Sequence, residues 1–99
     1  MDAVFRALAD ETRRGILKML RSGPKTSGEI ADRFDSSWPT ISRHLAVLRE
    51  AGLVTTERRG QEIHYELNTT VFEDVVQHLM GWVKPRVANG KARPSGQEI

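Results

Sequence analysis

The sequence predicts a mainly α-helical fold with a small β-hairpin, a winged helix-turn-helix whose elements follow in the order α-α-α-α-β-β-α. Three observations predict this order. Apolar residues recur at helical spacing up to residue 52, they alternate with polar residues from 53 to 67, and helical spacing returns from residue 70 to residue 83.

Length and composition predict one domain followed by a tail. A chain of 99 residues can build one modest core, which we place at residues 1–83. Residues 84–99 hold four Lys or Arg and one Glu, a net charge of +3, so residues 1–83 carry −1 of the total charge of +2. This composition predicts a basic, disordered tail. The chain lacks Cys and any long apolar run, so we expect a cytoplasmic protein with no thiolate metal site and no membrane segment.

The first two helices are predicted from short apolar stripes. Val4, Phe5 and Leu8 form the first stripe. Asp10 can cap the second helix, which contains Ile16, Leu17 and Leu20, and Gly23-Pro24 ends it. The residues from Thr26 to Glu29 read T-x-x-E, a capping box that opens a short third helix with Ile30, Ala31 and Phe34 toward the core.

A fourth helix and a hairpin follow. Ser37 is a favourable N-cap, Pro39 is tolerated in a first helical turn, and Gly52 is placed to end the helix. Ile41, Leu45 and Leu48 form its buried stripe.

Two strands are expected at 53–58 and 62–67 around a turn at 59–61. A second T-x-x-E pattern, Thr70 to Glu73, predicts the start of the last helix.

The fourth helix is predicted to read DNA, because the second helix of a helix-turn-helix enters the major groove. Opposite its buried stripe it carries small polar residues and Arg43, which can pair with guanine. The helix start suits a phosphate, and Arg58 with Arg59 at the hairpin tip suits backbone or minor-groove contact. The predicted DNA-contacting residues are Ser37, Trp38, Pro39, Thr40, Ser42, Arg43, His44, Arg58, Arg59 and Gln61.

The last helix predicts a second copy of the chain as partner. Its apolar residues spread over more than one narrow stripe, and a partner subunit would cover that excess. They are Phe72, Val75, Val76, Leu79, Met80 and Trp82. A two-fold homodimer would hold two recognition helices about one DNA turn apart, so we expect double-stranded DNA with an inverted-repeat operator.

Two segments of the chain resemble the ArsR family of dimeric winged-helix repressors. They are FRALADETRR at residues 5–14 and SWPTISRHLAVLREAGLV at residues 37–54. The similarity, closest to the branch without metal-binding cysteines, implies a dimer through the first and last helices, which adds Val4, Phe5 and Leu8 to the interface. It also implies DNA contact through residues 37–48, a wing ending at 58–61, and repression of the protein's own operon. Trp38 departs from the small or polar residue usual there. It either widens the DNA-contacting surface or packs on the preceding helix, and of the two we expect the packing.

Three other functions are each compatible with part of the sequence. A metal-responsive repressor would use Asp74 and His78, one turn apart, with Glu73 nearby, but a zinc site needs more ligands than one such helix offers. An enzyme is not expected, since His44, His64 and His78 fall on three separate elements. A winged-helix protein-interaction module is the third alternative, and it would need apolar anchors opposite Ile41 and Leu45. We predict no cofactor and no catalytic residue, and the sequence leaves the inducer open.

Overall fold

The computed structural model describes residues 1–83, so the predicted basic tail at 84–99 lies outside the described residues. The elements are α1 (Asp2–Leu8), α2 (Glu11–Met19), a 3-10 turn (Leu20–Ser22), β1 (Lys25–Thr26), α3 (Ser27–Arg33), α4 (Trp38–Glu50), β2 (Val54–Arg59), β3 (Glu62–Leu67) and α5 (Thr69–Val83). This order confirms the predicted helices and hairpin and adds one short strand, β1, that the sequence analysis did not predict.

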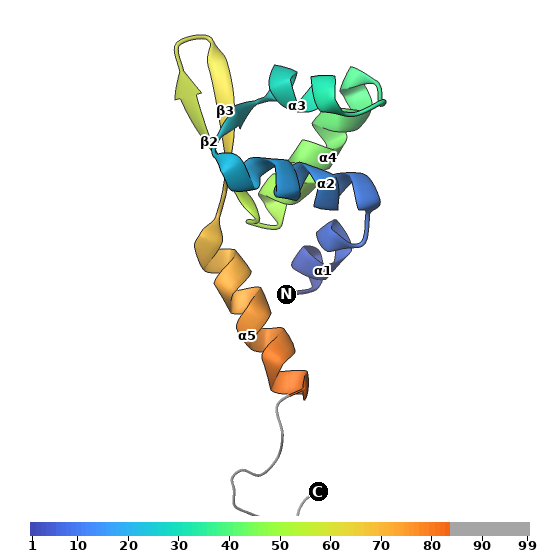
Figure 1. Ribbon diagram of the computed structural model, residues 1–99, viewed down its shortest axis with the longest axis vertical. Helices are drawn as coiled ribbons and strands as arrows, with labels where there is room; N and C mark the ends of the chain where they lie inside the picture. The colour runs from blue at the N-terminus through green and yellow to red at the C-terminus, as the bar shows by residue number, and fades with distance from the viewer. Residues whose placement is uncertain (84–99) are drawn as a thin grey trace, which may run out of the picture.

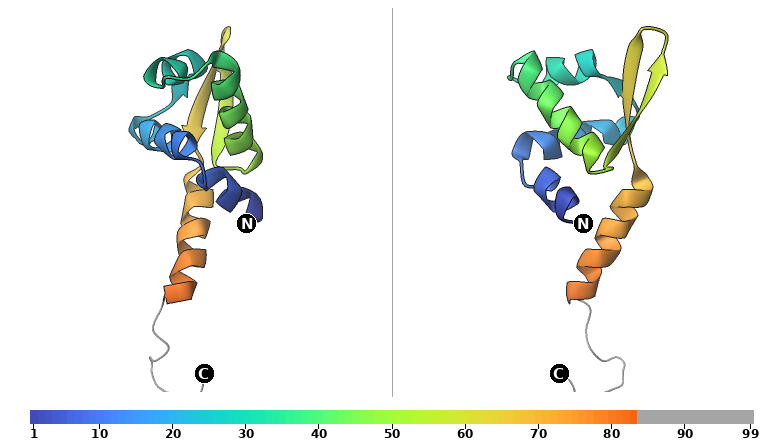
Figure 2. Two further views of the ribbon diagram at one scale, coloured as in Figure 1. Left: turned by 90° about the vertical axis from the view of Figure 1, so that its right-hand side faces the viewer. Right: turned by 180° about the vertical axis from the view of Figure 1, so that it is seen from behind.

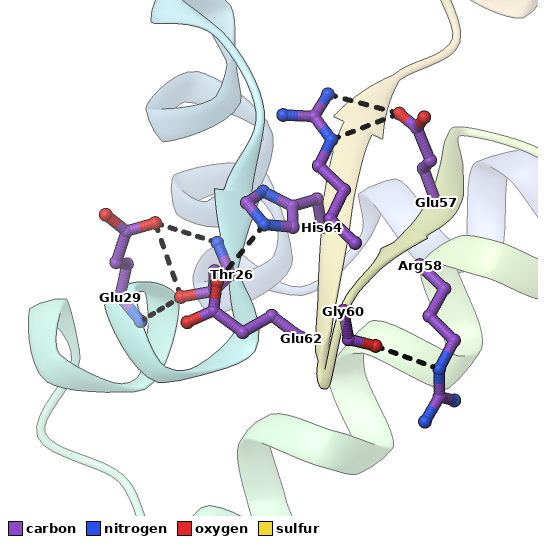
Figure 3. Close-up of polar contacts among 8 residues, drawn as sticks. Thr26, Glu29, Glu57, Arg58, Gly60, Glu62 and His64 are labelled. Atoms are coloured by element: carbon purple, nitrogen blue, oxygen red, sulfur yellow. Dashed lines mark hydrogen bonds and ion pairs between the residues drawn. The ribbon is translucent and has the colours of Figure 1, made fainter.

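Three predicted helix starts are confirmed by their side-chain caps. The Asp10 carboxylate accepts a hydrogen bond from the Arg13 backbone N–H at 3.1 Å and begins α2. At α3 the capping box is complete, because Thr26 Oγ1 accepts from the Glu29 N–H at 3.1 Å while Glu29 Oε1 accepts from the Thr26 N–H at 2.8 Å (Figure 3). Ser37 begins α4 in the same way, accepting from the Thr40 N–H at 3.3 Å. Each cap satisfies a backbone donor that the helix leaves free.

Gly52 ends α4 as predicted. Its φ of +79° is a left-handed conformation that favours glycine. The Gly52 N–H donates to the Arg49 carbonyl at 3.0 Å, and the Leu53 N–H donates to the Leu48 carbonyl at 3.0 Å, which is the Schellman pattern. The turn buries Leu53 completely and directs the chain into β2.

The predicted capping box at Thr70 is wrong. Helix α5 begins one residue earlier, at Thr69, so Thr70 lies inside the first turn. The Asn68 carbonyl already accepts from the Phe72 N–H at 3.3 Å, and the Asn68 N–H donates to the Leu53 carbonyl at 2.9 Å. Because Asn68 is anchored in this way to Leu53, in the turn between α4 and β2, helix α5 starts directly after it.

The three strands form an antiparallel sheet in the order β1-β3-β2. In the β2–β3 hairpin, Val54 pairs with Leu67 and Arg58 with Ile63, and on the other edge of β3 Thr26 pairs with His64. One face of the sheet packs on the helices. The buried core comprises Val4, Ala7, Ile16, Leu17, Leu20, Ile30, Ile41, Leu45, Leu48, Leu53, Val54 and Val75.

The two ends of the molecule are built differently. The hairpin tip, α3 and the start of α4 lie at one end, and α5 projects from the body at the opposite end, with α1 beside its base (Figures 1 and 2). Among residues 1–83, no helix combines the length and the apolar character that a bilayer crossing requires.

Candidate nucleic-acid interface

Helix α4 begins at the end of the molecule that carries the hairpin tip (Figure 2), and polar side chains dominate its exposed face. Its buried side is the predicted stripe Ile41, Leu45 and Leu48. The exposed side chains of the helix include Trp38, Pro39, Ser42, Arg43, Ala46 and Arg49. The structure thus brings most of the predicted α4 residues together on one accessible surface.

The hydroxyl groups at the start of α4 bond to each other. Ser37 Oγ donates to Thr40 Oγ1 at 3.0 Å and also accepts from the Thr40 backbone N–H. Thr40 is half-buried, whereas Ser37, Trp38 and Pro39 are exposed. The positive end of the helix dipole therefore faces solvent beside small polar groups, which favours a phosphate.

Two arginines on the exposed side of α4 are available for a polyanion. Arg43 and Arg49 take part in no ion pair within the described part of the chain. Arg49 was missing from the predicted contacts. It lies seven residues after Ser42, and with Ser42, Ala46 and Tyr65 of β3 it lines a groove of about 420 Å³ between α4 and the hairpin. Helical spacing from Ser42 is the signal that could have identified it.

The hairpin tip separates its two arginines onto opposite faces. Alternation along β2 places Arg58 on the same face as buried Val54, toward the helices, and Arg59 on the outer face. Arg58 Nε donates to the Gly60 carbonyl at 3.2 Å (Figure 3). Arg59 is ion-paired with Glu57 at 3.1 Å, on the outer face of the hairpin. Gln61 is exposed at the turn.

His44 does not share the exposed face of α4, although it was predicted to contact DNA. Its side chain is only 16% exposed and points to the connection between α1 and α2. There Arg13 Nη1 lies 3.2 Å from its Nδ1 and Asp10 Oδ2 lies 3.8 Å from its Nε2. Sequence analysis treated Arg13 only as part of a motif, and the structure makes it the centre of this contact.

Trp38 is both packed and exposed. The tip of its ring lies 4.0 Å from the position that a Cβ on Gly28 of α3 would occupy, so it covers the start of the preceding helix. The side chain nevertheless remains 55% exposed. The expected packing on α3 thus leaves an indole edge at the candidate interface.

The predicted dimer residues fall into two groups. Val4 and Val75 are buried within this subunit, and Leu8 and Phe72 are half-buried against its core. Val76, Leu79, Met80 and Trp82 lie in the solvent-exposed part of α5, where Trp82 is 67% exposed. Phe5 of α1 lies beside this surface, because its ring centroid is 5.9 Å from those of both His78 and Trp82.

A metal-responsive role gains no support from the single subunit. Within residues 1–83, no three His, Cys, Asp or Glu side chains lie close enough together to hold a metal ion. Glu73, Asp74 and His78 are each exposed on α5.

Comparison with known proteins gives consistent matches. The family model described as bacterial regulatory protein, arsR family, matches residues 10–56. The transcriptional repressor SdpR of Bacillus subtilis strain 168 is 43% identical over 83 residues, covering 84% of this chain and 92% of SdpR. The arsenic resistance transcriptional regulator ArsR1 of Pseudomonas putida is 39% identical, over 92% of this chain and 80% of ArsR1. An ArsR-like transcriptional regulator from Rhodococcus sp. RHA1 has a TM-score of 0.74 at 32% identity, covering 81% of this chain and 76% of that one.

Proposed function

Because the chain belongs to the ArsR family of bacterial DNA-binding transcriptional regulators, we propose that it is a homodimeric repressor whose two α4 helices bind an inverted-repeat operator. The observation that carries the proposal is the division of the molecule into a polar, arginine-bearing end and an apolar end. In a two-fold dimer that forms through the apolar end, both copies of α4 are presented on the same side of the dimer. Such a protein acts where DNA is, in the cytoplasm, and needs no catalytic residue.

The dimer part of the proposal is supported by the exposed apolar side chains of α5. A soluble monomer seldom exposes a continuous apolar patch of this kind, and a partner would remove it from water. Val76, Met80 and Trp82 are each more than half exposed. Phe5 lies beside Trp82, which supports the participation of α1 in the same interface.

The DNA part of the proposal assigns separate roles to α4 and the hairpin. Arg43 is exposed on α4 and can pair with a guanine, so we assign it to base recognition. Ser37, Pro39, Thr40 and Ser42 precede it at the start of α4 and suit phosphate or base contacts. Trp38 adds an exposed ring edge at the same helix start. His44 is assigned to positioning α4, since its ring faces Asp10 and Arg13.

The hairpin contributes affinity more than sequence preference. Arg58, Arg59 and Gln61 stand at its exposed tip, where cations contact phosphates without reading bases. Arg58 lies on the sheet face that carries the helices, so it is the better placed of the two arginines to act together with α4.

The test is fluorescence-anisotropy binding to the DNA upstream of the protein's own gene and to a scrambled sequence, at several salt concentrations. We expect the wild type to prefer its own upstream DNA, Arg43→Ala to lose that preference, and Arg58→Ala to weaken both DNAs alike. Arg21→Ala, an exposed change on the 3-10 turn away from the start of α4 and the hairpin tip, is the matched control and should bind as the wild type does. Absence of binding to both DNAs at low salt would refute the repressor proposal.

A further inference from the structure

A groove of about 320 Å³ lies between α2 and the connection from β3 to α5, away from α4 and the hairpin tip. Its floor is apolar and consists of Leu8, Leu17, Leu67 and Phe72. Leu17 is buried, and the other three side chains are half-buried. The volume lies at the lower end of the range of small-molecule sites, which are mostly apolar with a few convergent polar groups.

Three cationic residues border this floor, and they line it with the aliphatic parts of their side chains. Arg14, Lys18 and Arg21 follow each other at intervals of four and three residues, so they lie on one side of α2 and the 3-10 turn after it. All three are exposed. Like charges at this spacing repel one another. The helix dipole offsets part of this repulsion, because Lys18 and Arg21 lie in the last turns of α2 and of the 3-10 turn.

The three cations form no ion pair within the described residues, although Glu11 lines a neighbouring hollow with Arg14 and Lys18. No Asp or Glu within residues 1–83 lines the groove itself. Arg14 is held in place from one side, because its Nη1 donates to the Leu8 carbonyl at 2.8 Å. The charge here is local, since residues 1–83 carry a net charge of −1.

We propose that this groove binds a small amphipathic monocarboxylate, with its alkyl chain on the apolar floor and its carboxylate beside Lys18 and Arg21. The alkyl chain would cover apolar surface that is now open to water. The carboxylate would supply the negative charge that the rim lacks. The inference does not depend on DNA binding, because it is tested on the protein alone.

A second copy of the chain is the competing occupant. Leu8 and Phe72 of the groove floor are among the residues predicted for the dimer interface, and Phe72 stands four residues before Val76 on α5, so the groove overlaps the edge of the surface that we assign to dimerisation. Lys is depleted where subunits meet, and a partner covering this groove would have to desolvate three cations. The charge of the rim therefore favours a small anion over a subunit.

The experiment is a titration of the ¹⁵N-labelled full chain with sodium decanoate, kept below its micelle concentration, followed by backbone amide shifts. We expect saturable shifts at Leu8, Leu17, Lys18, Leu67 and Phe72. The variant Lys18→Glu should raise the Kd about fivefold or more, since it replaces an attraction at the rim by a repulsion. Arg33→Glu, an equally exposed charge reversal outside the groove, is the matched control and should leave the Kd unchanged.

Three results would overturn the proposal. Equal binding of 1-decanol and decanoate would show that the cations recognise no charge. Binding seen only above the micelle concentration, or only to anionic phospholipid vesicles, would show surface adsorption. A Lys18→Glu variant that changes the oligomeric mass in light scattering, without decanoate binding to the wild type, would assign the groove to the second copy. The DNA-binding proposal is unaffected by any of these results.

Discussion

Arg13 Nη1 lies 3.2 Å from Nδ1 of His44, joining the start of α2 to α4. Arg13 can only donate, so Nδ1 of His44 accepts this hydrogen bond when the ring is neutral, and the ring proton is then on Nε2, toward Asp10. The same guanidinium donates to the carbonyls of Arg6 at 3.0 Å and Ala7 at 2.7 Å. One side chain thus connects the last turn of α1 with the candidate recognition helix.

Arg13→Ala should destabilise the fold by about 2 kcal/mol, because it removes charge-assisted hydrogen bonds to two carbonyls and to His44. The free energy of unfolding from urea denaturation measures the loss. Arg33→Ala should change it by less than about 0.5 kcal/mol, since that side chain is exposed. Equal effects of the two substitutions would contradict the bridging role of Arg13.

Asp10 should make the fold sensitive to acid. The backbone N–H of Arg13 holds the pKa of the Asp10 carboxyl below its usual value, and the charges of His44 and Arg13 act in the same direction against partial burial. A carboxyl with a lowered pKa in the folded state stabilises the fold above its unfolded pKa, near about 3.9. That contribution disappears as the pH falls through the folded pKa.

Asp10→Asn tests this contribution because it keeps a capping oxygen and removes the charge. We expect the free energy of unfolding of the wild type to fall more between pH 6 and pH 3 than that of the variant, in urea denaturation at each pH. Parallel pH profiles for the two proteins would show that Asp10 contributes nothing through its ionisation.

The same substitution at two glycines should have opposite effects. Gly52→Ala places a side chain at a φ of +79° and should cost about 1 kcal/mol. Gly81→Ala lies within α5, where an added Cβ meets nothing within 4 Å, and should stabilise the protein by about 0.5 to 1 kcal/mol. Thermal unfolding of both variants measures the direction of each change in stability. A loss of stability in Gly81→Ala would mean that another part of the protein or a partner subunit already covers the face of α5 around Gly81.

Glu57→Gln should strengthen DNA binding. Glu57 pairs with Arg59 at the exposed tip, so its removal releases a cation and deletes a negative charge close to the phosphates. The expected gain in affinity is up to about fivefold, and the salt dependence should become steeper. Anisotropy binding at several salt concentrations measures both. Glu66→Gln, further from the tip on the same outer face, is the control. An equal gain in affinity for this variant would show that only the net charge of the protein matters.

Met80→Glu should separate the proposed dimer. Met80 is 51% exposed on α5, and a carboxylate there would be buried without a partner if a second copy covers the surface. Light scattering coupled to size-exclusion chromatography should show a lower mass than for the wild type at equal concentration. A monomeric wild type would disprove the dimer directly, and Glu73→Gln on the same helix serves as the control.

The sequence patterns correctly predicted those features of the fold that depend on interactions between residues close together in the chain. The buried stripe of α4 follows from the spacing of Ile41, Leu45 and Leu48, and the glycine end follows from the backbone conformation that Gly52 alone adopts easily. These features depend on residues within one or two turns of each other. The broad apolar surface of the last helix predicted that two copies act together, and the family resemblance added the first helix to the expected interface.

Contacts between distant segments could not be predicted in this way. The inward direction of His44 depends on Arg13, which is 31 residues away in the chain. Strand β1 has two residues and no alternation to detect, and it exists because Lys25 and Thr26 lie beside β3. At α5, Asn68, Thr69 and Thr70 are each acceptable helix starts, and the bond from Asn68 to Leu53 selects among them.

The pairing of β1 with β3 has a consequence for how the hairpin can vary. Thr26 is at once a strand residue opposite His64 and the cap of α3, so the base of the hairpin is joined to the helix pair. Beyond that pairing, the hairpin tip around Gly60 is exposed. Tips of other lengths and charges could therefore be exchanged, by mutation or by design, to tune the strength of nucleic-acid binding while the rest of the domain keeps its structure.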